Sequence, residues 1–207
     1  LIGALAGLAK AAIGGKATKQ TDTLMLKGLF TTITNVNFNN ETILQLKAEI
    51  EREKESIGGG KYGDYDMKNI WDADEDIRSL KSLILFGIKG MAAYAYHALA
   101  LGKTDDEVNS FFYDALSAIT EEKTSEELLS LVLKTGEVNL KCMAMLDAAN
   151  TEAYGNPVPT EVSLTIEKGP FIVVSGHDLH DMKLLLEQTK DKGINIYTHS
   201  EMLPAHG

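Results

Sequence analysis

Apolar residues recur at helical spacing along most of the chain. Ile43, Leu46 and Ile50 share one face of a predicted helix, and acidic residues open a longer predicted helix from Asp72 to Leu101. Apolar positions three and four residues apart are typical of amphipathic α-helices, and acidic side chains stabilise the positive end of a helix dipole. The pattern therefore predicts a helical bundle domain over residues 1–155.

Two capping motifs mark the starts of further helices. Thr104 with Glu107, and Thr124 with Glu127, have the spacing of a capping box, in which each side chain bonds the backbone N–H of the other residue. Apolar stripes follow both motifs, as expected of helices that face a core. The stripes consist of Val108, Phe111, Phe112, Ala115 and Ile119 after the first motif, and of Leu128, Leu131, Val132 and Leu133 after the second.

Glycines interrupt the helical pattern at two places. Residues 57–69 are rich in glycine and are predicted to form a flexible loop. The run Gly58–Gly60 within them resembles a phosphate-binding loop only superficially, because no apolar strand precedes it and no Lys-Ser/Thr follows it. Gly87 and Gly90 lie inside the second predicted helix, where glycine costs about 1 kcal/mol relative to alanine. We therefore expect this helix to contact another helix closely.

The pattern changes after the helical region. Pro157 and Pro159 cannot continue a helix, and β-branched residues cluster beyond them. An apolar run at 171–174, helical spacing over 178–192 and a second apolar run at 194–197 predict a strand, a helix and another strand. A strand–helix–strand crossover makes the two strands parallel.

The predicted fold class is mainly α. We expect a helical bundle domain over residues 1–155, followed over residues 156–207 by the first β-α-β unit of a truncated Rossmann-like α/β domain. Continuous apolar runs are expected of strands that are buried on both faces. Because one such unit is not a finished sheet, we interpret the chain as part of a longer protein.

His177 and Glu201 lie just past the ends of the two predicted strands. Parallel strands end at the same edge of a sheet, where open α/β sheets bind their ligands. Neighbouring strands lie about 4.8 Å apart, so an imidazole and a carboxylate at this edge could reach one iron or zinc ion. The alternative is structural, because a histidine after a strand can also cap the next helix or bond a backbone carbonyl.

The remaining histidines and the cysteine have simpler interpretations. We predict that His180 is an exposed helix residue and that His97, within an apolar segment, is packed in the core. Cys142 is predicted to be a small buried apolar residue rather than a reactive thiol. His199 and His206 are candidates for orienting metal ligands from outside the coordination sphere.

Composition narrows the classes of function. The net charge is −10 over 207 residues, which argues against binding to nucleic acid or to anionic membranes. A single cysteine excludes an intramolecular disulfide and a thiolate-only metal site made by this chain alone. The apolar opening segment is too short to span a bilayer and has no features of a secretory signal, so we expect a cytoplasmic protein.

Several motifs closely resemble the hybrid cluster protein family, also called prismane proteins or hydroxylamine reductases. The resemblance covers nearly the whole chain. The two motifs nearest the end of the chain are specific, and they contain His177 and Glu201. The motifs are SGHDL at 175–179, YTHSEMLPAHG at 197–207, LDAANTEAYGNPVPTEV at 146–162, RSLKSLILFGIKGMAAYAYHALALG at 78–102 and TNVNF at 34–38.

This resemblance implies an iron–sulfur oxidoreductase. Members have a helical domain and two α/β domains, a 4Fe-4S cluster held by cysteines near the N-terminus, and a hybrid iron–sulfur–oxygen cluster held by one His, two Glu and several Cys. The family pattern places two of the hybrid-cluster ligands on His177 and Glu201. The implied reaction reduces a small nitrogen-oxide substrate, hydroxylamine to ammonia or nitric oxide to nitrous oxide, with electrons from an external donor.

The chain departs from the family pattern in its cysteines. The N-terminal cysteine motif and the later cysteines are absent, and Cys142 does not match a family ligand position. We therefore expect a fragment that holds no intact cluster, has little or no reductase activity, and self-associates through its truncated sheet edge or is disordered near its C-terminus. Two alternatives stay open: a carbon monoxide dehydrogenase-like nickel–iron enzyme, and a non-catalytic helical fragment with no cluster.

Overall fold

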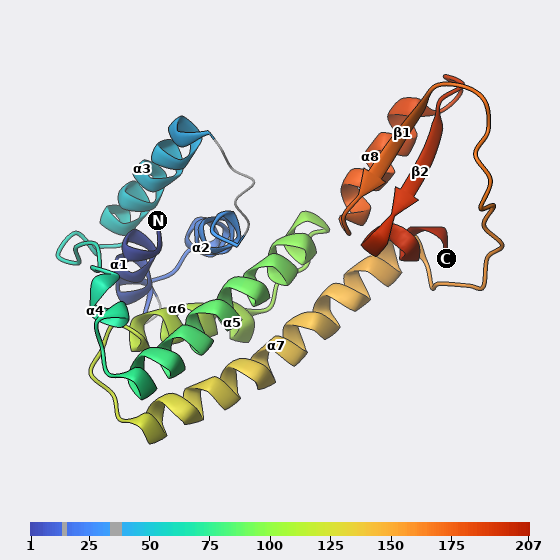
Figure 1. Cartoon of the computed structure of the whole chain (residues 1–207). Coiled ribbons are helices and arrows are strands. Elements are labelled where there is room, and N and C mark those ends of the chain that lie inside the picture. Colours follow the sequence, from blue (N-terminus) through green and yellow to red (C-terminus); the bar gives the residue numbers. More distant parts are fainter. Residues whose placement is uncertain (14–15, 34–38) are drawn as a thin grey trace. The chain divides into compact units, whose positions relative to one another are not determined.

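The computed structural model describes residues 1–13, 16–33 and 39–207 (Figure 1). The TNVNF motif at 34–38 lies outside the described residues. Contacts divide the chain into two compact units, residues 1–146 and 147–207. The helices of the first unit are α1 (Ile2–Ala12), α2 (Lys19–Thr31), α3 (Asn40–Ser56), α4 (Lys68–Trp71), α5 (Glu75–Ala100) and α6 (Asp106–Ala118), and α7 (Ser125–Tyr154) runs from the first unit into the second.

Helix α1 is central to the core of the first unit. Leu5 and Leu8 are fully buried, and α1 packs against α2, α3 and α6. The glycine-rich segment also lies against α1, since the Tyr65 backbone N–H donates to the Gly3 carbonyl at 3.1 Å. A Cβ atom at Gly3 would overlap the carbonyl oxygen of Tyr65. The prediction of a flexible loop was therefore incomplete, because here glycine on α1 permits close approach of the loop's backbone.

Helix α5 begins at Glu75, three residues later than predicted, and extends to Ala100. A Cβ atom at Gly87 would lie 2.9 Å from Cγ2 of Thr135 on α7, so the predicted close helix contact is confirmed there. At Gly90 a Cβ atom would have no described atom of another element within 4 Å. Among the described helices, α5 is the one long and apolar enough to cross a membrane by length and composition, but most of its buried residues belong to the core of the first unit.

The starts of α6 and α7 show how capping differs from the sequence pattern. The Thr124–Glu127 capping box is confirmed, with Thr124 N–H donating to Glu127 at 2.8 Å. At α6, however, the cap is Asp105 rather than Thr104, and its carboxylate accepts from the backbone N–H groups of Glu107 and Val108, each at 3.0 Å. A carboxylate at this position also pairs with Lys141 of α7 at 2.9 Å, which a threonine hydroxyl could not match.

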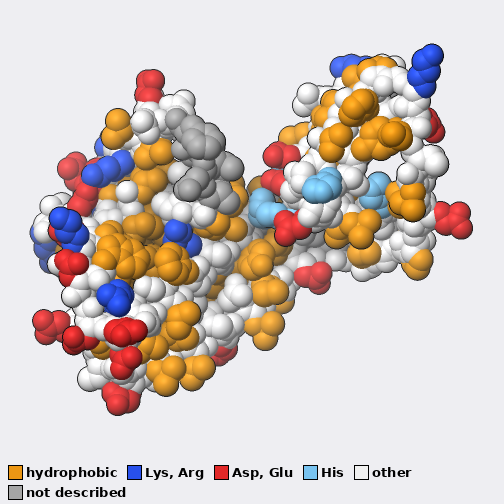
Figure 2. All heavy atoms as spheres, viewed as in Figure 1, with side chains coloured by type: hydrophobic (Ala, Val, Ile, Leu, Met, Phe, Trp, Pro, Cys, Tyr) orange, Lys and Arg blue, Asp and Glu red, His pale blue; other side chains and the backbone are white. Residues whose placement is uncertain are grey.

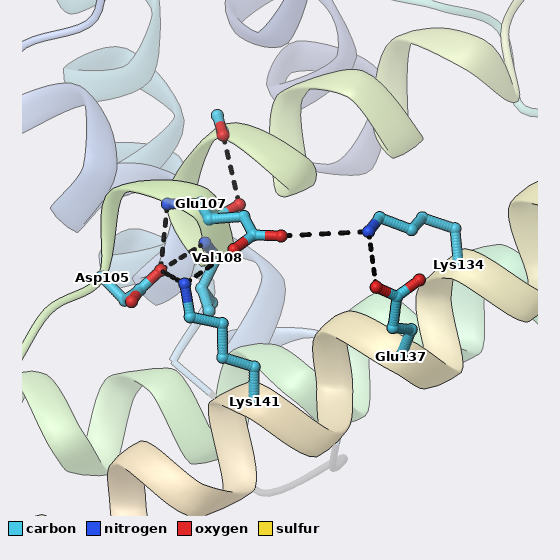
Figure 3. A network of polar contacts seen from close by, with 7 residues as sticks. Asp105, Glu107, Val108, Lys134, Glu137 and Lys141 are labelled. Atoms are coloured by element: carbon cyan, nitrogen blue, oxygen red, sulfur yellow. Dashed lines mark hydrogen bonds and ion pairs between the residues drawn. The ribbon is translucent and has the colours of Figure 1, made fainter.

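An ion-pair network joins the start of α6 to α7 (Figure 3). Lys141 reaches Glu107 at 2.7 Å, and Lys134 lies between Glu107 and Glu137 at 3.8 and 3.0 Å. These side chains are largely exposed, so each pair contributes little to stability on its own.

The network connects two helices whose apolar stripes are both predicted from sequence. The α6 stripe is buried as predicted, whereas Leu133 on α7 is 69% exposed, so its assignment to the core was wrong.

Cys142 is fully buried between α7 and α5. Its Sγ lies 3.6 Å from the carbonyl oxygen of Met91. Burial raises the pKa of the thiol to about 12, so the group stays protonated and unreactive at neutral pH. The prediction of a small buried residue is confirmed.

The second unit contains the predicted strand–helix–strand order. Strand β1 (Phe171–Ser175) is followed by α8 (Leu179–Thr189), β2 (Asn195–His199) and a 3-10 helix, η1 (Ser200–His206). The strands pair in parallel, with Phe171 opposite Asn195 and Ser175 opposite His199. Asp178 caps α8 by accepting from the backbone N–H of His180 at 2.9 Å. The predicted mainly helical fold with a partial α/β unit is confirmed.

The strands are less buried than their apolar sequence predicts. Phe171 is 61% exposed and Val173 is 60% exposed. The expectation of burial on both faces was wrong. The described sheet has only two strands, and the face that carries Phe171 and Val173 is left open. The preceding extended segment is also exposed, with Leu164 99% accessible.

Candidate metal centre

The ends of β1 and β2 bring His177 and Glu201 together. Ser175 and His199 are the last paired residues of the two strands, and each candidate ligand follows its paired residue by two positions. The His177 Nδ1 atom lies 3.2 Å from Oε2 of Glu201. The proximity expected from a shared carboxyl edge is thus present in the structure.

Both chain segments turn at the residue before the candidate ligand. Gly176 has φ 127°, and Ser200 has φ 55°. Glycine adopts such angles at no steric cost, whereas a non-glycine residue in the left-handed region costs roughly 1–2 kcal/mol. Residues held in sparsely populated backbone regions cluster at functional sites. The turn at Ser200 directs the chain from β2 into η1, whose first turn contains Glu201.

The His177–Glu201 pair lies at the surface of the second unit. The two side chains are 58% and 71% exposed, and Figure 2 shows histidine and acidic side chains close together on this unit. An exposed ion pair contributes about 0–1 kcal/mol to stability. The contact between His177 and Glu201 therefore adds little to the stability of the unit.

His199 and His206 contact the strands that carry the pair. The Nδ1 atom of His199 lies 3.0 Å from the Ser175 hydroxyl, across the last position of the register. The Nε2 atom of His206 lies 2.7 Å from the hydroxyl of Thr198. Sequence reasoning selected both histidines but missed the two hydroxyl groups, because only the strand register shows which residues face them.

The other histidines lie outside this pair. His180 occupies the first turn of α8 and is half-buried, so the expectation of an exposed residue was wrong. His97 is half-buried in α5 and packs edge-on against Phe30, with ring centroids 5.5 Å apart.

The pair fits part of a metal-binding set. An imidazole nitrogen and a carboxylate oxygen are both ligands of iron and zinc, and the short distance between them allows one ion to contact both. Over residues 1–13, 16–33 and 39–207, however, no group of three or more His, Cys, Asp or Glu side chains is arranged to hold a metal. The described residues therefore supply two donors and not a complete coordination shell.

A separate cavity of about 550 Å³ lies within the second unit. It is bounded by the last turns of α7, by α8 and by η1, and its walls include Tyr154, Met182, Leu186 and Pro204. Met182 is nearly buried, and Leu186 is about half exposed. The cavity is mainly apolar, unlike the edge that carries His177 and Glu201.

Comparison with known proteins identifies close relatives of the whole segment. Residues 1–207 match the model of the Prismane/CO dehydrogenase family. A hydroxylamine reductase of Solidesulfovibrio magneticus is 46% identical over 236 residues, covering 100% of this chain and 44% of that protein. The hydroxylamine reductase of Maridesulfovibrio salexigens is 41% identical, covering 94% of this chain and 40% of that protein.

A third relative comes from another organism. A hydroxylamine reductase of Methanocella arvoryzae is 40% identical, covering 100% of this chain and 44% of that protein. The chain thus spans less than half the length of the curated relatives it matches. Since the family model matches residues 1–207 throughout, the chain belongs to the Prismane/CO dehydrogenase family.

Proposed function

We propose that the chain is part of an iron–sulfur oxidoreductase that reduces hydroxylamine to ammonia, and that His177 and Glu201 are two protein ligands of its hybrid iron–sulfur–oxygen cluster. The observation that carries this proposal is the 3.2 Å approach of the two side chains at the shared end of β1 and β2. The names of the relatives support the substrate, since they are called hydroxylamine reductases.

The two donors suit a redox site that also binds a small substrate. Nitrogen and oxygen ligands are harder than thiolate and leave iron less electron-rich. When bound, the cluster would supply electrons and an open iron position for a small nitrogen-oxide substrate. The role of this chain's residues is to hold the imidazole and the carboxylate at one point on the sheet edge.

We infer that the remaining ligands lie in the part of the whole protein that this chain does not cover. The relatives extend well beyond the matched segment, which accounts for 38–44% of their length in the examples above and in Acetivibrio thermocellus. We infer that residues 1–207 alone hold no intact cluster. In the whole protein, a 4Fe-4S cluster would pass electrons from an external donor, and the protein would act in the cytoplasm on nitric oxide or hydroxylamine.

The test uses the full-length protein encoded by the same gene. His177→Ala and Glu201→Gln are compared with Glu187→Gln, which changes an exposed carboxylate on α8. We expect the first two variants to lose iron and the electron paramagnetic resonance signal of the hybrid cluster, together with hydroxylamine-dependent oxidation of a reduced dye. The Glu187→Gln variant should keep all three properties.

Two results would contradict the proposal. The ligand assignment fails if His177→Ala and Glu201→Gln keep both the iron content and the cluster signal of the wild type. The reaction assignment fails if the intact protein oxidises carbon monoxide and does not reduce hydroxylamine, and that result would support the carbon monoxide dehydrogenase-like alternative.

A further inference from the structure

Helix η1, which carries Glu201, is short and has weak internal support. It is a 3-10 helix of seven residues, and Pro204 lies inside it. Hydrogen bonds in 3-10 helices have poorer geometry than those in α-helices, and proline has no N–H to donate. The position of η1 therefore depends on contacts with the rest of the unit.

Several described contacts hold η1 against the rest of the unit, among them a backbone hydrogen bond from Val158 N–H to the Gly207 carbonyl at 2.9 Å. Met202 is 3% exposed, so its side chain is anchored in the small core of the unit. The His206 ring reaches back to the Thr198 hydroxyl at 2.7 Å. This bond joins the end of η1 to the strand that precedes it.

The Thr198–His206 hydrogen bond joins two residues that lie before and after Glu201 in the sequence. Thr198 belongs to β2, the chain turns at Ser200, and His206 ends η1. Without the closing bond, the end of η1 would keep the packing of Met202 and the backbone bond from Val158 to Gly207, but it would lose its side-chain link to β2. With the bond, both ends of the segment that contains Glu201 are tied to β2.

We propose that Thr198 and His206 are positioning residues, and that their hydrogen bond holds the Glu201 carboxylate beside His177 before any metal binds. This inference rests on the proposed function, because it assumes that the pair binds a metal. Groups that orient metal ligands typically change metal affinity by about 10- to 100-fold when they are removed. The bond between His199 and Ser175 acts on the other side of the site by aligning the strand ends.

A matched pair of substitutions at Thr198 tests the proposal. Thr198→Val removes the hydroxyl and keeps a β-branched side chain suited to a strand, whereas Thr198→Ser keeps the hydroxyl. The probe is Co²⁺ alone, titrated into the metal-free chain and followed by visible absorption. We expect Thr198→Val to weaken Co²⁺ binding about tenfold and Thr198→Ser to bind within about twofold of the wild type.

A second pair of substitutions, at His206, distinguishes loss of the hydrogen bond from a folding defect. His206→Gln retains a side-chain amide that can bond Thr198, whereas His206→Leu cannot. We expect the glutamine variant to bind Co²⁺ more tightly than the leucine variant, with all four variants melting at the temperature of the wild type. Amide hydrogen exchange over residues 200–206 should be faster in Thr198→Val and in His206→Leu only.

The outcomes separate the positioning role from the metal site itself. If His177→Ala abolishes Co²⁺ binding while Thr198→Val binds like the wild type, the positioning role is wrong and the proposed ligands stand. If His177→Ala binds like the wild type, the ligand assignment is wrong. Affinity losses that simply follow a lowered melting temperature, with no rescue by Thr198→Ser or His206→Gln, would also overturn the positioning role.

Discussion

Different interactions stabilise each of the two units of this chain. In the first unit almost every residue of α1 is buried, and large apolar side chains from α2, α5 and α6 complete one core. In the second unit the described buried apolar side chains are few, chiefly Met182 and Met202, and the strand residue Phe171 is 61% exposed. Packing therefore fixes the first unit, whereas strand pairing and side-chain hydrogen bonds fix the second.

The candidate chemistry lies on the less buried unit. His177 and Glu201 follow the last positions of the strand register, with a turn at Ser200 beside Glu201, and His199 and His206 form hydrogen bonds with strand hydroxyl groups nearby. The comparison predicts that core substitutions will affect the first unit strongly and leave the His177–Glu201 pair in place.

The largest effect is expected from Leu8→Ala. Leu8 is fully buried in α1, and truncating a buried leucine typically costs about 2–5 kcal/mol of unfolding free energy. Urea unfolding followed by fluorescence of Trp71, the single tryptophan, reports on the first unit. The control is Leu164→Ala, at a 99% exposed position of the second unit, which should change that free energy by less than about 0.5 kcal/mol. If Leu8→Ala and Leu164→Ala lower the unfolding free energy equally, the proposed difference between the two units is wrong.

A smaller effect is expected where the glycine-rich loop lies against α1. Gly3→Ala places a Cβ atom over the Tyr65 carbonyl, and overpacking of this kind costs about 1–3 kcal/mol. Gly90→Ala is the matched substitution on α5, with no described atom within 4 Å, and should instead stabilise by about 0.4–1 kcal/mol. The same urea measurement shows whether each substitution raises or lowers the unfolding free energy. A stabilising Gly3→Ala would show that the loop does not pack on α1.

The smallest effect concerns the cap of α6. Asp105→Ala should lower the unfolding free energy by about 1 kcal/mol, because the first backbone N–H groups of the helix lose their acceptor. Thr104→Ala should change it by less than about 0.5 kcal/mol. Thermal unfolding of both variants checks the order. If Thr104→Ala lowers the unfolding free energy more than Asp105→Ala does, Thr104 is the cap, as the sequence pattern predicts.

Local patterns predicted most of the helices and the strand–helix–strand unit. The apolar stripe that contains Val108 and Phe112 is buried as expected, because helical periodicity is a property of the sequence alone. The approach of His177 to Glu201 was also predictable, since parallel strands end at one edge of a sheet. Their role as ligands stays a prediction.

Features that depend on distant neighbours were not predictable. Asp105 replaces Thr104 as the cap where Lys141, far along the chain, also pairs with it. Exposure of Phe171 depends on which other strands lie beside β1, and the sequence of β1 does not contain that information. The turn at Ser200 and the bond from His206 to Thr198 likewise require the register of the sheet.

The burial of α1 has a consequence for synthesis on the ribosome. Helix α1 is made before α6, yet it packs against α6, which is complete only at Ala118. At typical translation rates of about 5–20 residues per second, the nascent helix waits on the order of ten seconds for that partner. Through this interval its apolar surface is available to chaperones, so expression at low temperature, where elongation slows, should increase the nascent chain's dependence on them.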